Sequence, residues 1–341
     1  MENKLALITG VRGQDGSWLT KLLLEKNYNV IGIDRRSGNG EKYNWRHKEL
    51  GIDGKFKIDY CDISEFHNVC EIIEKYKPDE VYNLAAESFV QTSFQQPFHV
   101  LDVNGKGQLN FLEAIRKYSP NTKIYFAGSS EQYGKVQEIP QTEKTIFYPR
   151  SPYACAKVFG YDITRNYREA YGLFACSGIL FNHTGILRGE EFVTRKITQN
   201  MARWYLNKIT SFELGNIDSL RDFGSAEDYV EMMYKMLQQN IADDFVISSN
   251  ETHSIREIIQ ICFEYLDIKE EYKYSGIDTQ IWAKGMPVIT MNKEFFRPTE
   301  VDLLLGCSEK AKNVIGWQPK TSFRDLIRGM LEKDLEREFE R

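Results

Sequence analysis

The chain has 341 residues, of which 42% are apolar and 27% charged, and this is enough apolar material for one large folded domain or two ordinary ones. Its formal net charge of −5 leaves no basic surplus, which argues against nucleic acid or an anionic membrane as a partner. No signal peptide and no apolar run of the ~18 residues of a membrane span are visible, and six scattered cysteines without a CxxC pair indicate reduced thiols in a cytoplasmic protein.

The first half of the chain alternates short apolar runs with longer amphipathic ones. Buried strands are predicted at Leu5–Thr9, Asn29–Asp34, Phe56–Asp59, Glu80–Leu84, Lys123–Ala127 and Phe174–Leu180. Helices are predicted between them, at Gly16–Lys26, Glu65–Lys77, Gly105–Tyr118 and Pro152–Tyr171. This alternation predicts an α/β fold in which a doubly wound parallel sheet of the Rossmann type is covered by helices on both faces.

After about residue 181 the pattern loosens. Helices are predicted at Thr194–Asn207, Ser225–Gln239, Ile255–Leu266, Ser308–Ile315 and Ser322–Glu338, separated by loops and short strands. We therefore expect a dinucleotide-binding domain over residues 1–180. A smaller mixed α/β lobe for the substrate is expected over residues 181–341, with some crossing of the chain between the two.

A glycine-rich turn follows the first predicted strand directly. It reads GVRGQDG and opens the first predicted helix. Glycines let such a turn close and let backbone N–H groups approach a pyrophosphate at the start of the helix. The position between a strand and a helix predicts a dinucleotide site. Its candidate cofactor contacts are Gly10, Arg12, Gly13, Gln14, Asp15 and Gly16.

The second strand ends in a mixture of charges at Asp34, Arg35 and Arg36. An acid at this position normally binds the ribose 2′-hydroxyl of NAD and would repel the 2′-phosphate of NADP. Arginines bind phosphate bidentately, and Arg12 can reach the same place. Three cations against one carboxylate favour NADP over NAD, although Arg35 and Arg36 could instead be solvated loop charges.

The ends of the next two strands carry further candidates for the cofactor. Asp62, with Ile63 beside it, follows the third strand, where a carboxylate could meet the adenine amino group. The fourth strand ends in Leu84, Ala85 and Ala86, whose small side chains would let the backbone approach the cofactor.

A tyrosine and a lysine share one helical face at Tyr153 and Lys157. About one YxxxK pair is expected by chance in a chain with 19 tyrosines, so the spacing alone decides nothing. Its position decides more, because the pair begins the helix after the fifth strand, whose end carries Ser129 and Glu131. We expect the Lys157 ammonium and a nicotinamide ring to lower the pKa of Tyr153 towards that of a useful base.

Seven strings make the sequence similar to the GDP-mannose 4,6-dehydratase family. They are Gly13–Ser17, Tyr133–Pro140, Phe147–Ala154, Gly178–His183, Phe192–Ile197, Leu214–Phe223 and Arg297–Leu304, within a resemblance that runs from about residue 4 to residue 330. Ser129 stands at a threonine of the family, Glu131 at its catalytic glutamate, and Tyr153 and Lys157 at its base and helper. Ser130-Glu131 matches the GDP-mannose branch, in which one glutamate works without the aspartate of other sugar-nucleotide 4,6-dehydratases.

The resemblance implies an internal redox cycle. Tyr153 removes the proton from the sugar O4 as hydride passes from C4 to NADP+, while Ser129 hydrogen-bonds O4. Glu131 then takes the C5 proton, which the 4-ketone has made acidic, and water leaves from C6. Hydride returns to C6, so the product is a 4-keto-6-deoxy sugar nucleotide and the cofactor ends as it began.

Further site residues follow from the same resemblance. The substrate contacts that it implies are Ser88, Ser129, Glu131, Asn182, Val193, Lys196, Leu214, Asn216, Arg221, Arg297 and Glu300. The cofactor contacts that it adds are Ser88, His99, His183 and Arg188. The partners implied are a GDP-sugar and further copies of the chain, in a dimer or a tetramer. No HxH or HExxH spacing indicates a metal.

Four departures from the family pattern leave the exact sugar open between mannose, a heptose and others. Residues 182–188 read NHTGILR where the family has NHESPRR, and residues 86–89 read AESF where it has AQSH. His99 stands at a family tyrosine, and Asp34 at an uncharged residue. A C4 epimerase or dehydrogenase on the same scaffold, and a non-catalytic protein that senses NADP, remain as alternatives.

Overall fold

A parallel sheet of seven strands forms the centre of the computed structural model, which describes residues 3–35, 44–295 and 303–340. The strand order is β11-β6-β5-β4-β1-β2-β3, and every neighbouring pair is parallel. The strands are β1 (Leu5–Thr9), β2 (Asn29–Asp34), β3 (Lys57–Tyr60), β4 (Glu80–Asn83), β5 (Lys123–Ala127), β6 (Ala175–Leu180) and β11 (Phe245–Ile247). The predicted doubly wound sheet is confirmed.

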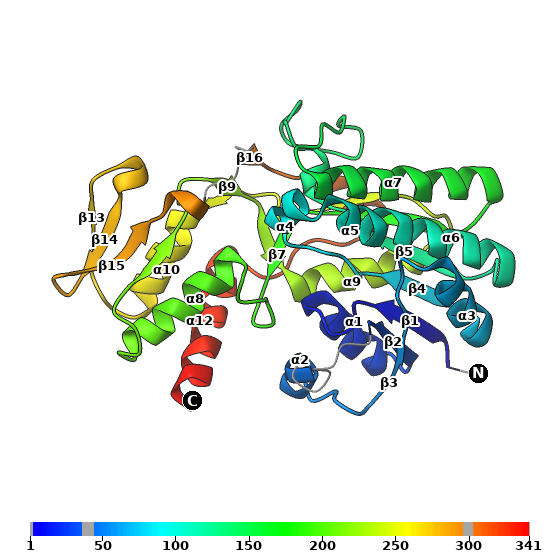
Figure 1. Cartoon of the computed structure of the whole chain (residues 1–341), viewed down its shortest axis with the longest axis horizontal. Helices are drawn as coiled ribbons and strands as arrows, with labels where there is room; N and C mark the ends of the chain where they lie inside the picture. The colour runs from blue at the N-terminus through cyan, green and yellow to red at the C-terminus, as the bar shows by residue number, and fades with distance from the viewer. Residues whose placement is uncertain (1–2, 36–43, 296–302, 341) are drawn as a thin grey trace.

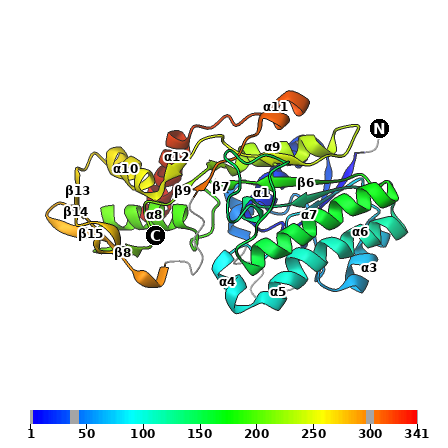
Figure 2. The same ribbon diagram turned by 90° about the horizontal axis from the view of Figure 1, so that it is seen from above.

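Helices cover both faces of the sheet (Figures 1 and 2). One face carries α1 (Gln14–Glu25) and α9 (Ala226–Leu237), and the other carries α3 (Phe66–Tyr76), α6 (Gly107–Tyr118) and α7 (Pro152–Tyr171). Successive strand residues point to opposite faces, so Ile8 joins the core under α1 and α9 while Leu7 joins the core under α3 and α6. Burial on both faces explains why these strands read as continuous apolar runs.

The order of the strands determines where a ligand can bind. The chain moves from β1 outward through β2 to β3, then returns to β4 on the other side of β1 and continues through β5 and β6. The connections therefore diverge at β1 and β4, and a crevice opens at the carboxyl ends of these two strands.

A smaller lobe lies beside this sheet, to the left in Figure 1. It packs three helices, α8 (Val193–Tyr205), α10 (Ile255–Tyr265) and α12 (Phe323–Glu340), around their own apolar core. Its sheet has the order β13 (Glu270–Lys273), β14 (Gln280–Ala283), β15 (Met286–Met291) and β8 (Phe212–Leu214). Short strand pairs complete it, made by β7 (Asn182–Thr184) with β10 (Phe223–Ser225), and by β12 (His253–Ser254) and β16 (Leu303–Leu304) with β9 (Leu220–Arg221).

The chain crosses between the lobes after residue 180. Both α9 and β11 belong to the large sheet unit, and α11 (Glu309–Ile315) packs on β11, although all three follow that residue. The helix predicted from Gly105 is longer than expected: α5 (Pro97–Leu101), a π-helical turn at Asp102–Lys106 and α6 succeed one another without a break. Two short helices, α2 (Trp45–Glu49) and α4 (Val90–Gln95), were not predicted. Among the described residues no helix is long and apolar enough to cross a membrane.

Candidate active site

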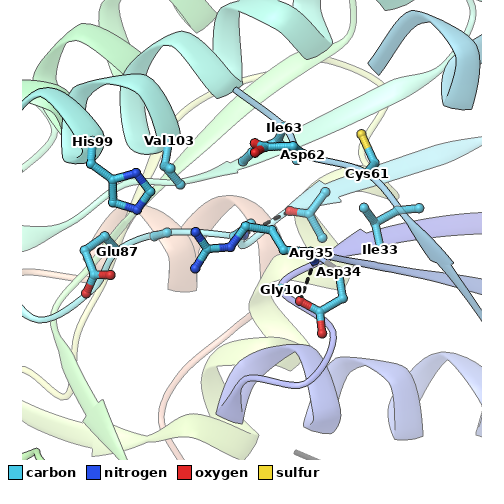
Figure 3. Close-up of a pocket in the computed structure, with 13 residues that line it drawn as sticks. Gly10, Ile33, Asp34, Arg35, Cys61, Asp62, Ile63, Glu87, His99 and Val103 are labelled. Atoms are coloured by element: carbon cyan, nitrogen blue, oxygen red, sulfur yellow. Dashed lines mark hydrogen bonds between the residues drawn. The ribbon is translucent and has the colours of Figure 1, made fainter. Parts of the chain in front are cut away.

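A pocket opens at the crevice between β1 and β4, as the sheet order requires (Figure 3). Residues at the carboxyl ends of β1, β2, β3 and β4 line it, and His99 and Val103 line it from the helical stretch that precedes α6. The pocket therefore gathers candidates from four separate stretches of the sequence, among them Gly10, Asp34, Asp62 and Ala86.

The glycine turn forms a cradle that side chains would fill. Gly10 has φ +64°, and a Cβ added there would lie 3.0 Å from the backbone N of Ala85. A Cβ added at Gly16 would lie 2.3 Å from the carbonyl oxygen of Gly10, so α1 can approach the turn this closely only with glycine at that position. Gly13 is the N-cap of α1, and no side chain of the described chain caps this N-terminus. The backbone N–H groups at this N-terminus of α1 fit the pyrophosphate of a dinucleotide.

Thr9, which the sequence analysis missed, holds the other wall of this cradle. Its hydroxyl accepts hydrogen bonds from the backbone N–H groups of Leu84 at 3.0 Å and Ala85 at 2.9 Å, and it donates to Asn83 Oδ1 at 2.8 Å. The end of β4 is thereby held beside Gly10. A polar residue that closes an otherwise apolar strand was the available signal for this role.

Asp34 is paired with Arg12 in the protein itself. Arg12 Nη1 donates to Asp34 Oδ2, while Asp34 Oδ1 accepts the backbone N–H of Arg35 at 2.7 Å. Burial works against the Arg12 charge, but the Asp34 carboxylate outweighs it and raises the pKa of Arg12. The Arg35 side chain extends into the pocket towards Glu87 and His99 (Figure 3). Arg36 lies outside the described residues.

Asp62 presents a second carboxylate to the same pocket. Its Oδ1 accepts hydrogen bonds from the N–H and the hydroxyl of Ser64, at 3.0 and 2.7 Å. Burial alone would raise the pKa of Asp62, but the Ser64 hydrogen bonds and the charges of Arg35 and His99 lower it. Ile63 is buried next to it, and Ser88 is exposed in the loop before α4.

The end of β5 turns into a short, fully buried 3-10 helix at Ser130–Gln132. Ser129 caps it: its hydroxyl accepts the N–H of Glu131 at 3.3 Å, and its own N–H donates to Gln132 Oε1 at 2.7 Å. The turn thus fixes Ser129 and Glu131 relative to each other. Gln132 was missed, although the S-x-x-Q spacing of a capping box indicates it.

The structure brings Tyr153 to this turn. Tyr153 lies at the start of α7 and shares a hydrogen bond with the Ser129 side chain. Burial is the largest effect on the phenol and raises the pKa of Tyr153 to about 12, with Glu131 adding to the rise. The Ser129 hydrogen bond and the charge of Arg188 act in the opposite direction. Ser129, Glu131 and Tyr153 therefore form one cluster.

Lys157 lies one helical turn further along α7. Its Nζ donates to the carbonyl of Ala127 at 2.8 Å and lies 5.8 Å from the centre of the Tyr153 ring. Only 3% of Lys157 is exposed, and burial lowers its pKa to about 7. In the protein itself burial is the largest effect on both side chains, so the expected lowering of the Tyr153 pKa by Lys157 and a nicotinamide ring together stays a prediction.

An ion pair joins the first turn of α1 to β7. His183 Nε2 lies 2.7 Å from Asp15 Oδ2, and its Nδ1 lies 2.8 Å from the carbonyl oxygen of Phe181. Burial would raise the pKa of Asp15, but the charges of His183 and Arg188 lower it. Both ring nitrogens of His183 therefore have an oxygen partner, one on α1 and one on the backbone at the end of β6. The Arg188 guanidinium stacks 3.6 Å from the centre of the Phe192 ring.

The substrate candidates lie on the small lobe and on the strands that join it to the sheet. Asn182 is on β7, Val193 and Lys196 are on α8, Leu214 ends β8, Asn216 follows it, and Arg221 is on β9. The Asn182 Nδ2 donor is buried and has no partner among the described residues, so it can serve a ligand. Lys196 Nζ lies 3.7 Å from the centre of the Phe295 ring, and Arg221 is buried. Arg297 and Glu300 lie outside the described residues.

Comparison with known proteins gives one consistent family. The family model described as "GDP-mannose 4,6 dehydratase" matches residues 7–330. Two curated proteins of that name come from Drosophila melanogaster and Vibrio cholerae serotype O1. Each is 45% identical to this chain over an alignment that covers 98% of this chain, and the alignments cover 87% and 95% of the two relatives. The solved structure of RMD from Pseudomonas aeruginosa, complexed with NADPH, has the same fold: its TM-score is 0.79 at 21% identity, over 98% of this chain and 100% of that one.

The buried lysine predicts a pH dependence of stability. The folded chain holds Lys157 with a pKa of about 7, against 10.5 when it is unfolded. Between these values the unfolded chain binds the proton and the folded chain does not, so the free energy of unfolding rises with pH. Relative to Lys157→Met, the wild type should gain about 2 kcal/mol between pH 7 and 9, and little between pH 6 and 7.

Urea unfolding of both proteins at each pH measures this difference. The carbonyl of Ala127 loses its donor in the variant at every pH. That loss changes the difference in the free energy of unfolding by a constant amount and not its dependence on pH. A difference that stays flat from pH 7 to 9 would show that Lys157 is charged in the folded protein.

Proposed function

The chain belongs to the GDP-mannose 4,6-dehydratase family, and on that premise we propose that it is a hydro-lyase that converts a GDP-sugar to its 4-keto-6-deoxy form. GDP-mannose or a related GDP-manno-heptose is the proposed substrate. The observation that carries the proposal is the cluster of Ser129, Glu131 and Tyr153 at the end of β5. A C4 epimerase or dehydrogenase needs the tyrosine but does not need Glu131. Elimination, in contrast, needs a base for the C5 proton, and Glu131 can be that base.

In the first half of the proposed cycle, Tyr153 Oη takes the proton from the sugar O4 while Ser129 Oγ hydrogen-bonds the same oxygen. The phenol is buried and its pKa is high, so it needs positive charge nearby to act as a base. Arg188 is the protein cation that acts in this direction. When bound, an oxidised nicotinamide ring supplies a second positive charge, together with the acceptor and donor of hydride for C4 and C6.

In the second half, Glu131 takes the C5 proton that the adjacent ketone has made acidic and passes it to the C6 hydroxyl, which leaves as water. The N–H of Glu131 is bonded to Ser129, so the base for C5 and the hydroxyl at O4 are positioned by one turn. Once hydride has returned to C6, the proton held by Tyr153 is returned to the sugar at C5, and both side chains end as they began. Burial of the turn keeps water away from the reacting atoms.

We propose that the nucleotide half of the substrate is bound from the small lobe. Arg221 suits the diphosphate, because a guanidinium binds phosphate oxygens in pairs. Lys196 can donate to a guanine carbonyl from the first turns of α8. Arg297 is proposed as a second diphosphate ligand and Glu300 as an acceptor for ribose hydroxyls. Asn182, with its unpaired buried donor, is proposed to bind the sugar.

For the cofactor we propose NADP in preference to NAD. The carboxylate that would repel a 2′-phosphate is the one already paired with Arg12, and Arg35 reaches into the same pocket. Glycines of the first turn, Asp62 and the end of β4 complete the proposed dinucleotide site.

A homo-oligomer, a dimer or a tetramer, is proposed for the assembly. Three large apolar side chains are exposed on neighbouring helices, namely Phe98 and Leu101 of α5 and Phe159 of α7, with Phe98 83% exposed. They form one patch, because a Cβ added at Gly105 would lie 3.0 Å from Phe159 and 3.3 Å from Leu101. An apolar patch of this kind marks an interface, and a second copy of the chain is the proposed occupant.

Charge placed in this patch should therefore dissociate the assembly. Phe98→Glu combined with Phe159→Glu is expected to lower the mass found by analytical ultracentrifugation to that of a smaller species. The control is Phe339→Glu on α12, at a residue that is 82% exposed and far from the patch in sequence and fold. A wild type that sediments as a monomer would end the proposal.

Removal of the acid should separate oxidation from elimination. Glu131→Gln keeps the shape of the turn but cannot take the C5 proton. In a single turnover with GDP-mannose we expect the absorbance of reduced cofactor to rise and persist, while mass spectrometry finds no product lacking one water. Elimination at the wild-type rate would show that another group is the base.

Tyr153→Phe is the matched control for this experiment. It removes the base for the first step, so neither reduced cofactor nor dehydrated product should form, and turnover should fall by about 10²–10⁴-fold. Nucleotide affinity should change little, because the ring still fills its space.

Competitive binding to stripped protein tests the cofactor. A charge-assisted hydrogen bond contributes ~1.5–3 kcal/mol, so we expect NADP to bind at least roughly ten-fold more tightly than NAD. Asp34→Ala should enlarge this preference, because it releases Arg12 for the phosphate. Asp59→Ala, which removes a carboxylate that pairs with Lys75 away from the pocket, should leave the ratio unchanged. If Asp34→Ala binds NAD more weakly than the wild type does, the carboxylate binds the ribose diol instead.

A further inference from the structure

The short helix α2 contacts both sides of the proposed cofactor site through one arginine. Arg46 Nη1 donates to the carbonyl of Arg12 in the glycine turn at 3.1 Å, and Arg46 Nε donates to the carbonyl of Leu187 at 2.7 Å. The neighbouring His47 adds a bond from Nε2 to the carbonyl of Val11 at 3.0 Å. Two consecutive carbonyls of the turn are therefore held by α2.

The partner on the other side is the segment Gly185–Glu191, here called the β7 loop, which carries Arg188. Two further arginines hold it by its carbonyls: Arg337 of α12 donates to Ile186 at 2.8 Å, and Arg195 of α8 donates to Arg188 at 3.1 Å. Both have a carboxylate partner in Asp334, at 2.8 Å from Arg195 and 3.4 Å from Arg337.

Arg46 differs from these two. Among the described residues it has no carboxylate within ion-pair distance, and the partners of its N–H groups are the two carbonyls alone. Its guanidinium lies 4.5 Å from the centre of the Trp45 ring. Burial and the charges of Arg195 and Arg188 lower the pKa of Arg46 to about 10, which still leaves it charged at neutral pH. A half-buried cation bonded to two carbonyls fixes their separation, because each carbonyl that loses the bond loses a charged donor.

We propose that Arg46 is a positioning residue of the cofactor site, holding the glycine turn and the β7 loop at a fixed separation. The proposal rests on the proposed function, since it takes the glycine turn and Arg188 to act on a bound dinucleotide. The two carbonyls belong to residues whose side chains or neighbours act on the ligand: Arg12 pairs with Asp34, and Leu187 immediately precedes Arg188.

The same tether bears on the proposed base. Arg188 lowers the pKa of both Tyr153 and Asp15, so its place decides how much positive charge the phenol receives. If Arg46 is removed, the β7 loop is still held by Arg195 and Arg337, but it is no longer held to the turn. Binding of the dinucleotide must then fix the glycine turn and the β7 loop relative to each other, and this cost weakens the affinity. The Arg188 charge is also displaced from Tyr153.

Direct binding of NADP to the stripped full-length protein tests this inference. Calorimetry of Arg46→Met should give a Kd at least about ten-fold above that of the wild type, in line with the loss of charge-assisted hydrogen bonds. Arg46→Lys keeps the charge but can reach only one carbonyl at a time, so its Kd should lie between the two. The loaded Arg46→Met enzyme should also show a lower kcat, with the pH at half-maximal rate moved upward because the phenol loses positive charge.

Arg203→Met is the matched control for stability. Arg203 pairs with Glu338 at 3.0 Å between α8 and α12, and within the described part of the chain this ion pair involves neither α2, the turn nor the β7 loop. It should lower the melting temperature without changing the NADP Kd. An Arg46→Met protein that binds NADP with the wild-type Kd overturns the inference and leaves the proposed function standing. A wild type that binds neither NADP nor NAD overturns the proposed function itself.

Discussion

Burial of charge at one edge of the sheet is the constraint on which the rest of this structure depends. Glu131 and Lys157 are buried, Asp15 and Arg46 are half-buried, and a charge withdrawn from water is stable only with a partner or a full set of hydrogen bonds. The fold meets this need with backbone as much as with counter-ions. Lys157 is held by the carbonyl of Ala127, and Arg46 by two carbonyls. Strand ends and loops must therefore turn their polar atoms inward, which makes the edge rigid where a ligand has to be placed.

The protein environment by itself favours the neutral forms of Tyr153 and Lys157. Burial raises the pKa of Tyr153 and lowers that of Lys157, so both are driven towards neutrality. Positive charge near the phenol opposes this tendency, and Arg188, which lies between β7 and α8, contributes to it. The Y-x-x-x-K spacing predicts that Tyr153 and Lys157 share a helical face, but it carries no information about Arg188 or about the burial of the phenol. The motif alone therefore could not indicate these effects on the tyrosine.

Much of the fold could be predicted from the sequence, because strands buried on both faces read as apolar runs and the long helices have clear periods. The strand β11 was not predicted, because three residues are too few to show a hydrophobic period. The helices α2 and α4, of five and six residues, were not predicted for the same reason. Proposed catalytic residues were found from motifs placed at strand ends. Thr9, Gln132 and Arg46 were not, because their partners are backbone N–H and carbonyl groups that every residue possesses. Only the fold shows which of those groups lie within reach.

The departures from the family pattern in β7 and in the β7 loop have a structural consequence of this kind. Thr184 stands at the family's acid, and its hydroxyl is buried 2.6 Å from that of Thr194. Leu187 stands at an arginine and is fully buried in the core beneath α1 and α9. Two charged side chains of the family pattern are thus replaced by packed ones, and the loop gains apolar anchorage. Its polar anchorage comes instead from the carbonyls that Arg46, Arg195 and Arg337 bind from three different helices. Because those bonds are made to backbone, the side chains of the loop are free to vary beside the proposed sugar site while the backbone at Arg188 keeps its place, and such an arrangement would allow the proposed change of hexose or heptose within one chemistry.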